Sequence, residues 1–163
     1  MIKKENKKLD FKIAFVAASW HEDLVNVAVN SCKSELQELG VDTEKNIKLF
    51  NVPGSLEIPL VSKTIIQSGE FDAVIAFGLV VDGGIYRHEF VAQTVLDGIM
   101  KVSLETKTPV LSVVLTPQKF DETNSEHIKF FQKHLVIKGQ EAARSAVQII
   151  QVISDLRQQD KKD

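Results

Sequence analysis

The chain has 163 residues, 44% hydrophobic and 26% charged, which is the composition of an ordinary globular protein with enough apolar surface for one core. Twenty basic and 22 acidic residues give a net charge of -2, so we expect no nucleic-acid or membrane binding driven by charge alone. A single cysteine excludes an internal disulfide, and no segment resembles a signal peptide or a membrane span, which favours a cytoplasmic protein.

Strand and helix patterns alternate along the chain. A short apolar strand is predicted over residues 11–18, followed by a helical stripe over 25–39 that Gly40 is placed to end. Cys32 lies on this stripe and is expected to be buried and unreactive. The remaining predicted elements are a strand at 47–52, a helix at 56–65, a strand at 73–81, a helix at 88–105, a strand at 109–115 and a helix at 139–156.

This alternation predicts a flavodoxin-like fold, a three-layer α/β/α sandwich with a four-stranded parallel sheet. We expect one domain over residues 11–156, with a flexible N-terminal segment at 1–10 and a flexible C-terminal tail at 157–163. Residues 116–138 are predicted to form one long connection, a length that is usually functional or disordered.

Ligands of such folds bind beyond the carboxyl ends of the strands. Four segments follow the predicted strands: 19–21, 52–57, 82–88 and the chain from 116 onward. Together they hold all four histidines, the only tryptophan and the only tyrosine. Trp20 is suited to stacking on a heteroaromatic ring, although a tryptophan that plugs the edge of the core is equally compatible with its position. Glu57 could offer a carboxylate to a ligand, but complementing a helix dipole is the favoured interpretation.

Gly83 and Gly84 precede a helix and could bring backbone amides close to a phosphate, as well as simply forming a tight turn. His88 is near enough to this turn to transfer a proton, and a helix-capping role is comparably compatible with its spacing. The dinucleotide fingerprint, the phosphate loop with its lysine, a histidine metal pattern and a nucleophile elbow are all missing from the sequence. We therefore expect no cofactor and no metal.

Several of these segments together resemble a known family. The stretches Val-Pro-Gly-Ser-Leu-Glu-Ile-Pro at 52–59 and Asp-Gly-Gly-Ile-Tyr-Arg-His at 82–88, with Lys-Gly at 138–139, are similar to lumazine synthase, 6,7-dimethyl-8-ribityllumazine synthase. The similarity covers roughly residues 11–156 in the right order, and the second stretch resembles the type II branch, whose members form decamers and usually accompany a second paralogue.

The resemblance implies a cofactor-free condensation of 5-amino-6-(D-ribitylamino)uracil with 3,4-dihydroxy-2-butanone 4-phosphate, the penultimate step of riboflavin biosynthesis. His88 matches the residue that transfers protons. The positions that match substrate contacts are Trp20, Ser55, Leu56, Glu57, Leu79, Val80, Val81, Ser112 and Lys138. The family's usual phenylalanine is replaced by Trp20, and Ser112 stands where a neighbouring subunit often supplies another phenylalanine.

The phosphate site departs from the family pattern. The common Gly-Ala-Thr-x-His motif is here Gly84, Ile85, Tyr86, Arg87 and His88, and residues 116–138 contain no counterpart of the phosphate-clamping arginine. His127 and His134 are our candidates to replace that arginine, with Arg87 behind them. The resemblance implies a homo-oligomer, either a pentamer or a decamer of two pentamers. The alternative function is a catalytically weak protein that binds flavin or lumazine.

Overall fold

A parallel sheet forms the middle layer of the molecule. In the computed structural model, which describes residues 8–161, its four strands lie in the order β2-β1-β3-β4. Their bounds are β1 (Ile13–Ala18), β2 (Ile47–Val52), β3 (Ala73–Leu79) and β4 (Val110–Leu115). Every residue of β1 and β3 is buried, as expected for central strands covered on both faces, whereas β2 and β4 are partly exposed edge strands.

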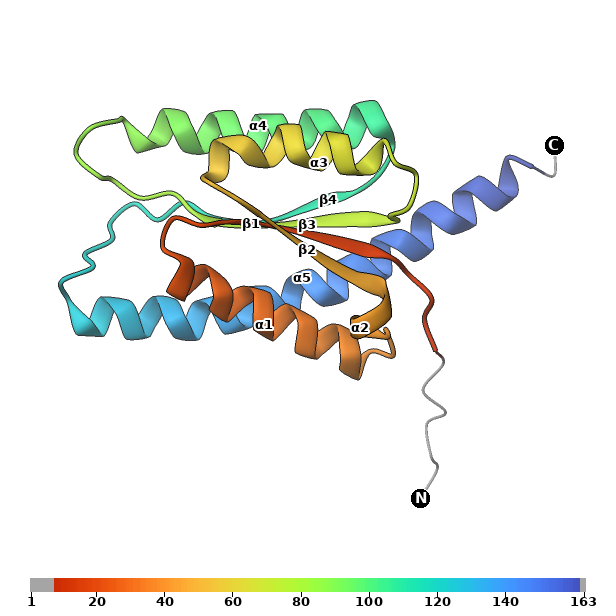
Figure 1. The fold of residues 1–163 in the computed structure, drawn as a ribbon, viewed down its shortest axis with the longest axis horizontal. Coiled ribbons are helices and arrows are strands. Elements are labelled where there is room, and N and C mark those ends of the chain that lie inside the picture. Colours follow the sequence, from red (N-terminus) through yellow and green to blue (C-terminus); the bar gives the residue numbers. More distant parts are fainter. Residues whose placement is uncertain (1–7, 162–163) are drawn as a thin grey trace, which may run out of the picture.

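Helices cover both faces of the sheet (Figure 1). One face carries α1 (Glu22–Glu38) and α5 (Ser125–Gln159), and the other carries α3 (Ile58–Ile66) and α4 (His88–Thr106). The short α2 (Thr43–Asn46) leads into β2, and the 3-10 turn η1 (Ser55–Glu57) leads from β2 into α3. This arrangement confirms the predicted three-layer, flavodoxin-like sandwich.

Alternate residues of the central strands supply two separate cores. Phe15 and Phe77 face α1 and α5, with ring centroids 5.0 Å apart, while Val16 and Ala76 face α3 and α4. Cys32 belongs to the first core and is fully buried, and this burial raises the pKa of its thiol. The prediction that Cys32 is a small buried hydrophobe is confirmed.

The last helix differs most from the prediction. The long connection expected over residues 116–138 is wrong, because only residues 116–124 join β4 to a helix that begins at Ser125 rather than at Gly139. The Asn124 side chain accepts hydrogen bonds from the amides of Glu126 and His127, which starts the helix 14 residues earlier than expected. The buried stripe of α5 runs unbroken through Phe131, Leu135, Gly139, Ala142, Ala143, Ala146 and Ile150.

Gly139 therefore lies inside α5, where it allows the closest approach to α1. A Cβ atom at this position would lie 2.5 Å from the carbonyl oxygen of Ala28 and 3.0 Å from the amide nitrogen of Cys32. Both contacts are with backbone atoms of α1, which have little freedom to move aside. The glycine that was expected to open the helix instead permits tight helix packing.

The other boundaries differ from the predictions by a few residues. The first strand begins at Ile13 instead of residue 11, and β3 ends at Leu79 instead of residue 81. Gly40 has a positive φ of 102° just after α1, as its predicted capping role requires, and Pro59 lies in the first turn of α3 as predicted.

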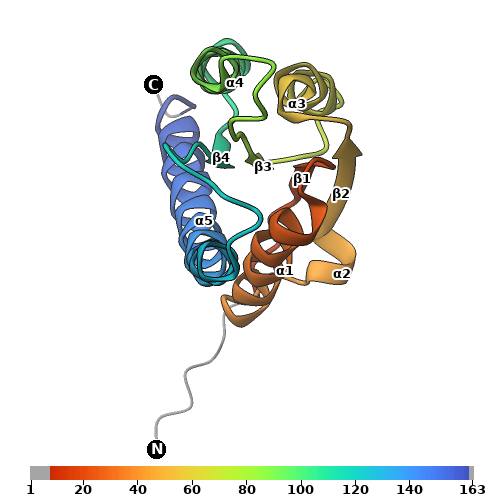
Figure 2. The ribbon, with the colours of Figure 1, turned by 90° about the vertical axis from the view of Figure 1, so that its left-hand side faces the viewer.

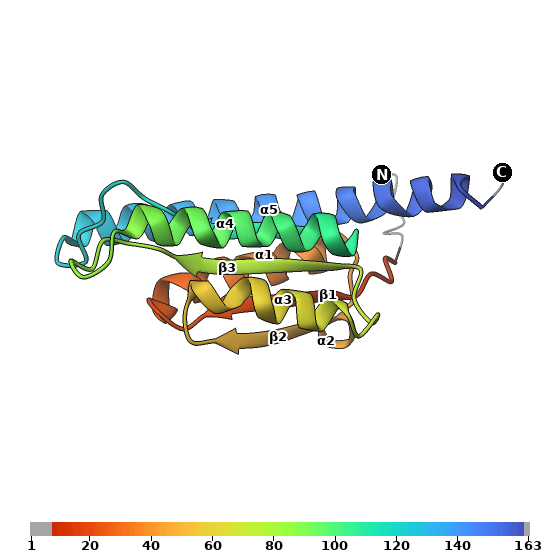
Figure 3. The ribbon, with the colours of Figure 1, turned by 90° about the horizontal axis from the view of Figure 1, so that it is seen from above.

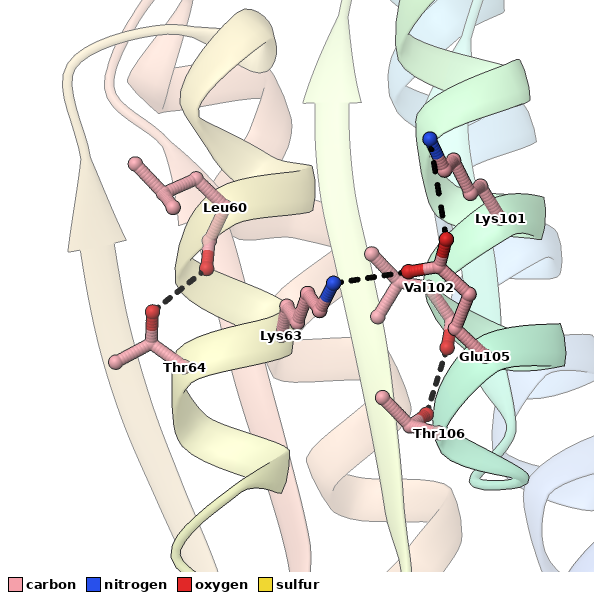
Figure 4. A network of polar contacts seen from close by, with 7 residues as sticks. All are labelled: Leu60, Lys63, Thr64, Lys101, Val102, Glu105 and Thr106. Atoms are coloured by element: carbon pink, nitrogen blue, oxygen red, sulfur yellow. Dashed lines mark hydrogen bonds and ion pairs between the residues drawn. The ribbon is translucent and has the colours of Figure 1, made fainter.

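Polar contacts join α3 to α4 on the outer surface (Figure 4). The Nζ atom of Lys63 donates to Oε2 of Glu105 at 2.8 Å, and Nζ of Lys101 lies 3.8 Å from Oε1 of the same carboxylate. The bond from Lys63 is the main cause that lowers the pKa of Glu105. Nearer the start of α3, the two helices pack closely, since a Cβ atom at Gly98 would lie 2.7 Å from Cγ of Pro59.

Parts of both predicted flexible ends, residues 1–7 and 162–163, lie outside the described residues. Within the described part, the Leu9 amide donates to the carbonyl oxygen of Gly40 at 3.0 Å, and Nδ2 of Asn46 donates to Oδ1 of Asp10 at 3.1 Å. At the other end, Arg157 donates to the carbonyl oxygen of Lys107 at 2.8 Å. Among residues 8–161, no helix combines the length and apolar character needed to span a membrane.

Candidate active site

Four turns converge on one end of the molecule because all four strands are parallel. They are the segments that follow β1, β2, β3 and β4, and they lie toward the viewer in Figure 2. The connections after β3 and β4 reach furthest beyond the sheet (Figure 3). The residues predicted to bind substrate and phosphate are mostly drawn from these four segments.

Trp20 follows β1 and lies beside the turn that follows β2. Its side chain is 70% exposed, which does not fit the alternative of a tryptophan that plugs the core. A Cβ atom at Gly54 would lie 3.6 Å from Cδ1 and 3.7 Å from Nε1 of Trp20, so the indole borders this glycine directly. Trp20 therefore presents an open aromatic surface next to the backbone of the β2 turn.

Glu57 closes the turn that contains Gly54. The Gly54 amide donates to Oε2 of Glu57 at 2.9 Å, so one carboxylate oxygen stabilises the start of η1. This contact agrees with the interpretation that Glu57 complements exposed amides at a helix start. Among residues 8–161, no hydrogen-bond donor contacts Oε1, and Glu57 is exposed, which leaves this second oxygen accessible to a ligand. Leu56, which precedes Glu57 in the same turn, is 52% exposed.

Ser55 anchors the same turn to the sheet. Its hydroxyl lies against Gly78 in β3, where an added Cβ atom would be only 2.6 Å from Ser55 Oγ. The three residues Trp20, Ser55 and Glu57, which the sequence assigned to one substrate, are thus brought together around Gly54. Sequence reasoning missed Gly78, although a glycine inside an otherwise apolar strand often marks a close approach of another segment.

Leu79, Val80 and Val81, at the end of β3, were all expected to contact substrate, but the first two are buried. Leu79 and Val80 are 4% and 7% exposed, and their side chains belong to opposite cores. Their side chains therefore do not line an open surface, and only the half-buried Val81 lies near one. The Val80 amide donates to the carbonyl oxygen of Leu115 at 2.9 Å, which extends the pairing of β3 with β4 beyond the strands.

The connection between β3 and α4 is highly exposed. Ile85 and Tyr86 are 85% and 77% exposed, and the Arg87 guanidinium lies over the Phe90 ring at 4.7 Å from its centroid. The amide of Gly84, which has a φ of 78°, donates to Oδ1 of Asp82 at 2.9 Å. The Gly84 amide, which was predicted to bind phosphate, therefore already donates to the Asp82 carboxylate of the same turn.

His88 is the first residue of α4. Its side chain is 14% exposed, and its Nδ1 atom lies 3.6 Å from Oε2 of Glu89. No side-chain hydrogen bond caps α4 within the described structure, so the capping role weighed for His88 is not formed. His88 thus stands where the exposed connection enters α4, a helix that lies with α3 on one face of the sheet (Figure 2).

His127 and His134 lie on α5, which covers the opposite face of the sheet. The amide of Asp121 donates to Nδ1 of His127 at 3.1 Å, so this nitrogen acts as an acceptor. The Asp121 carboxylate accepts from the Thr123 hydroxyl and amide, which lowers the pKa of Asp121. The His134 ring stacks on Phe130, with centroids 5.7 Å apart and an interplanar angle of 10°.

Two further predicted contacts lie away from these turns. Lys138 is 13 residues after the start of α5, about 20 Å along the helix axis, and its amine donates to Oε2 of Glu141 at 2.7 Å. This bond lowers the pKa of Glu141. Ser112 is an exposed residue in the middle of the edge strand β4, where its hydroxyl accepts from the Val114 amide at 3.2 Å. Neither side chain takes part in the contacts around Gly54 described above.

Two grooves of the described surface lie elsewhere. One, of about 510 Å³, runs between α1 and α5, and another, of about 620 Å³, lies between α4 and the second half of α5. No predicted site residue lines either groove. Because Trp20, Leu56 and Glu57 are all exposed, the turns after β1 and β2 form an open platform. Within residues 8–161, no group of three or more acidic, histidine or cysteine side chains is placed to hold a metal.

Comparison with known proteins adds an independent finding. The model of the 6,7-dimethyl-8-ribityllumazine synthase family matches residues 10–154. A protein of that name from Rhodococcus erythropolis is 48% identical over 134 residues, which cover 82% of this chain and 85% of the relative. Proteins named 6,7-dimethyl-8-ribityllumazine synthase 2 from Pseudomonas syringae pv. tomato and Bradyrhizobium diazoefficiens are 43% and 44% identical over 91% of this chain and 86% and 87% of their own lengths.

A match of this extent spans all four strands and, apart from the last residues of α5, every helix that positions the turns described above. It includes the platform formed by Trp20, Gly54 and Glu57 as well as the connection that leads to His88. The chain therefore belongs to the 6,7-dimethyl-8-ribityllumazine synthase family.

Proposed function

We propose that this protein condenses 5-amino-6-(D-ribitylamino)uracil with 3,4-dihydroxy-2-butanone 4-phosphate to 6,7-dimethyl-8-ribityllumazine, phosphate and water, as a transferase in riboflavin biosynthesis. The observation that carries the proposal is the platform at the ends of β1 and β2, in which an exposed indole borders a turn closed by Glu57. Membership of the family over nearly the whole chain supports the same reaction.

The platform suits a flat, polar ring with a hydroxylated chain. The indole of Trp20 offers a stacking surface, and the free oxygen of Glu57 accepts a hydrogen bond from the pyrimidine or the ribityl chain. The amides of Ser55 and Leu56 face the same turn at the start of η1. Of the three residues at the end of β3, only the half-buried Val81 offers a side chain to the ring, since Leu79 and Val80 are buried.

The chemistry requires positioning and proton transfer. Imine formation, loss of phosphate and ring closure each move protons between nitrogen, oxygen and carbon atoms of the two substrates. His88 is the imidazole closest along the chain to the β3 connection, and we assign it this transfer. Holding two polyfunctional substrates in attack geometry supplies a further large part of the acceleration.

The phosphate is assigned to residues of the β3 connection and of α5. Gly84, Ile85, Tyr86 and Arg87 contribute backbone amides and one guanidinium, and His127 and His134 contribute imidazoles. The Gly84 amide can bind phosphate once it is released by the Asp82 carboxylate. The Arg87 guanidinium can bind phosphate once it leaves the Phe90 ring. Both contacts are at exposed positions, where such rearrangements cost little.

We propose a homo-oligomer in which neighbours complete each site, either a pentamer or a decamer of the type II branch. His127, His134 and Lys138 lie on α5, on the face of the sheet opposite to the α4 helix that begins at His88, and we infer that a neighbouring chain completes the set of groups at each site. Exposed apolar side chains on α3 and α4 support burial against a neighbour, with Leu60, Phe90 and Leu104 each more than 60% exposed. The names of two relatives, which end in the number 2, support a place beside a second paralogue.

Sedimentation at micromolar concentration tests this assembly, and a stable monomer would contradict the shared site. A cytoplasmic location stays a prediction from the sequence, in keeping with one free cysteine among 163 residues.

A catalytically weak protein that binds flavin or lumazine is the second candidate. Residues 116–138 contain no arginine, and Nδ1 of His127 is already engaged by the Asp121 amide. These two observations favour a protein that keeps the ring platform but clamps phosphate poorly.

One experiment separates the two functions. Purified protein is mixed with both substrates, and lumazine formation is followed by absorbance beside a protein-free control. Turnover clearly above the spontaneous rate supports the synthase, whereas tight binding of riboflavin or lumazine without turnover supports the binding protein.

A further inference from the structure

Gly78 occupies a position in β3 where the backbone itself does not require glycine. The glycines with positive φ in the described chain are Gly40, Gly69 and Gly84, so Gly78 adopts a conformation that other residues also accept. Glycine inside a strand lowers its stability and often marks the close approach of another segment. The reason for this glycine therefore lies in its surroundings.

The surroundings point to one atom. A Cβ atom at position 78 would lie 2.6 Å from Ser55 Oγ, far closer than carbon and oxygen atoms tolerate, but 3.6 Å from Val114 Cγ1 and 3.7 Å from Ala18 Cβ, which are ordinary contacts. Only the Ser55 hydroxyl thus occupies the space that a side chain at position 78 would need.

This contact lies at the root of the platform. Ser55 begins η1, which packs against β1, β3 and α4. Two residues later, the Glu57 carboxylate binds the Gly54 amide, and Gly54 in turn borders the Trp20 indole. The depth at which Ser55 sits against β3 therefore affects where Glu57 lies and how the Gly54 turn meets the Trp20 indole.

We infer that Gly78 is a positioning residue for pyrimidine binding, because its missing side chain lets the Ser55 hydroxyl seat η1 against β3. A methyl group at position 78 forces the hydroxyl to rotate or η1 to move outward, and both displace Ser55 Oγ. This inference rests on the proposed function and assigns a role to a residue that does not touch the substrate.

A double-mutant cycle on the full-length chain tests the inference. Gly78→Ala, Ser55→Ala and the double variant are compared with the natural sequence in kcat and in KM for each substrate. Gly78→Ala is expected to raise KM for the pyrimidine substrate about tenfold, with a much smaller effect on KM for the phosphorylated substrate. Because Ser55→Ala removes the clashing atom, the double variant is expected to return to the values of Ser55→Ala alone.

Gly98→Ala is the matched control for a methyl group added at a crowded glycine. A Cβ atom there would lie 2.7 Å from Cγ of Pro59, yet this contact lies between α3 and α4 and does not involve Ser55. Ser55→Ala is therefore not expected to rescue Gly98→Ala.

Two readouts do not depend on turnover. Trp20 is the only tryptophan, so its emission spectrum reports directly on the platform, and thermal unfolding reports on the packing of η1. If the natural protein forms no lumazine, the proposed function fails. The inference is then tested by whether the double variant recovers the Trp20 emission spectrum and the unfolding temperature of Ser55→Ala.

The inference is overturned if Gly78→Ala behaves like the natural protein in all readouts, or if the losses of the two single variants multiply in the double variant. If Gly78→Ala does not fold, a double variant that folds supports the inference, and one that does not fold overturns it.

Discussion

The turns after β2 and β3 both contain glycine and lie at the same edge of the sheet, yet they are built in opposite ways. The β2 turn is closed by the Glu57 carboxylate on the Gly54 amide, anchored to the sheet by Ser55 and bordered by Trp20. The β3 connection is closed by the neighbouring Asp82 on the Gly84 amide, and the two residues after Gly84, Ile85 and Tyr86, are 85% and 77% exposed.

The difference indicates which half of the proposed reaction each turn serves. Contacts that are fixed before binding cost no ordering when the ligand arrives, so the β2 turn is preorganised for the pyrimidine substrate. The β3 connection has few contacts of its own to hold it, and its proposed phosphate partners on α5 lie across the sheet. We expect a neighbouring subunit to order it.

The largest expected effect comes from His88, where the exposed connection enters α4. His88→Ala should lower kcat about 100-fold, because a positioned proton donor and acceptor is lost while both binding surfaces remain. Steady-state kinetics should show little change in either KM and a residual rate still above the spontaneous reaction. A kcat equal to that of the natural protein would show that the proton moves through another group.

The second effect tests the preorganised turn. Trp20→Ala should raise KM for the pyrimidine substrate by about 10-fold to 100-fold, because stacking of a base on an aromatic ring contributes about 1–3 kcal/mol. KM for the phosphorylated substrate should change little, and Trp20→Phe should retain most of the affinity. Equal increases in both KM values would contradict the separation of the two halves.

A smaller effect is expected from the two histidines of α5. Replacing both, His127→Gln and His134→Gln, should raise KM for the phosphorylated substrate about two- to tenfold, because the two imidazoles assigned to the phosphate are lost. KM for the pyrimidine substrate should stay unchanged in the same assay. An unchanged KM for the phosphorylated substrate would exclude the two histidines.

The smallest effect concerns the ion pair between Lys63 of α3 and Glu105 of α4. Lys63→Ala should lower the unfolding temperature only slightly, because both partners are more than 40% exposed and rigidity here comes from packing. The Lys63 hydrogen bond lowers the pKa of Glu105 from its ordinary value of 4.5, so its contribution is present above that pH and is lost as pH falls below it. Thermal unfolding at pH 7 and pH 3.5 measures this, and a larger difference at the acidic pH would contradict it.

The fold was predictable where apolar periodicity was unambiguous. The buried runs of β1 and β3 and the stripe of α1 identified a parallel sheet covered by helices. The start of α5 was missed because histidines, lysines and glycine interrupt its first half, and Gly139 was taken for a boundary. The stripe formed by Phe131, Leu135 and Ala142 at helical spacing, together with Asn124 as a capping residue, was the available signal.

The candidate site was predictable only within the turns. The rule that ligands bind at the carboxyl ends of parallel strands placed Trp20 and Glu57 at one edge, and the structure brings them together. Sequence spacing does not reveal which face of the sheet a later helix covers, so it gave no sign that His134 and Lys138 lie across the sheet from His88. Nor does it reveal that Ser55 reaches back to Gly78, which is a contact between segments 23 residues apart.

Cys32 gives the molecule one practical property. It is the only sulfhydryl of the chain, and it is enclosed between α1 and the sheet with its ionisation suppressed. Alkylating dyes should consequently leave the folded protein unlabelled. A cysteine introduced at an exposed position such as Tyr86 would then carry the sole fluorophore, and distances between such probes would report how subunits are arranged in solution.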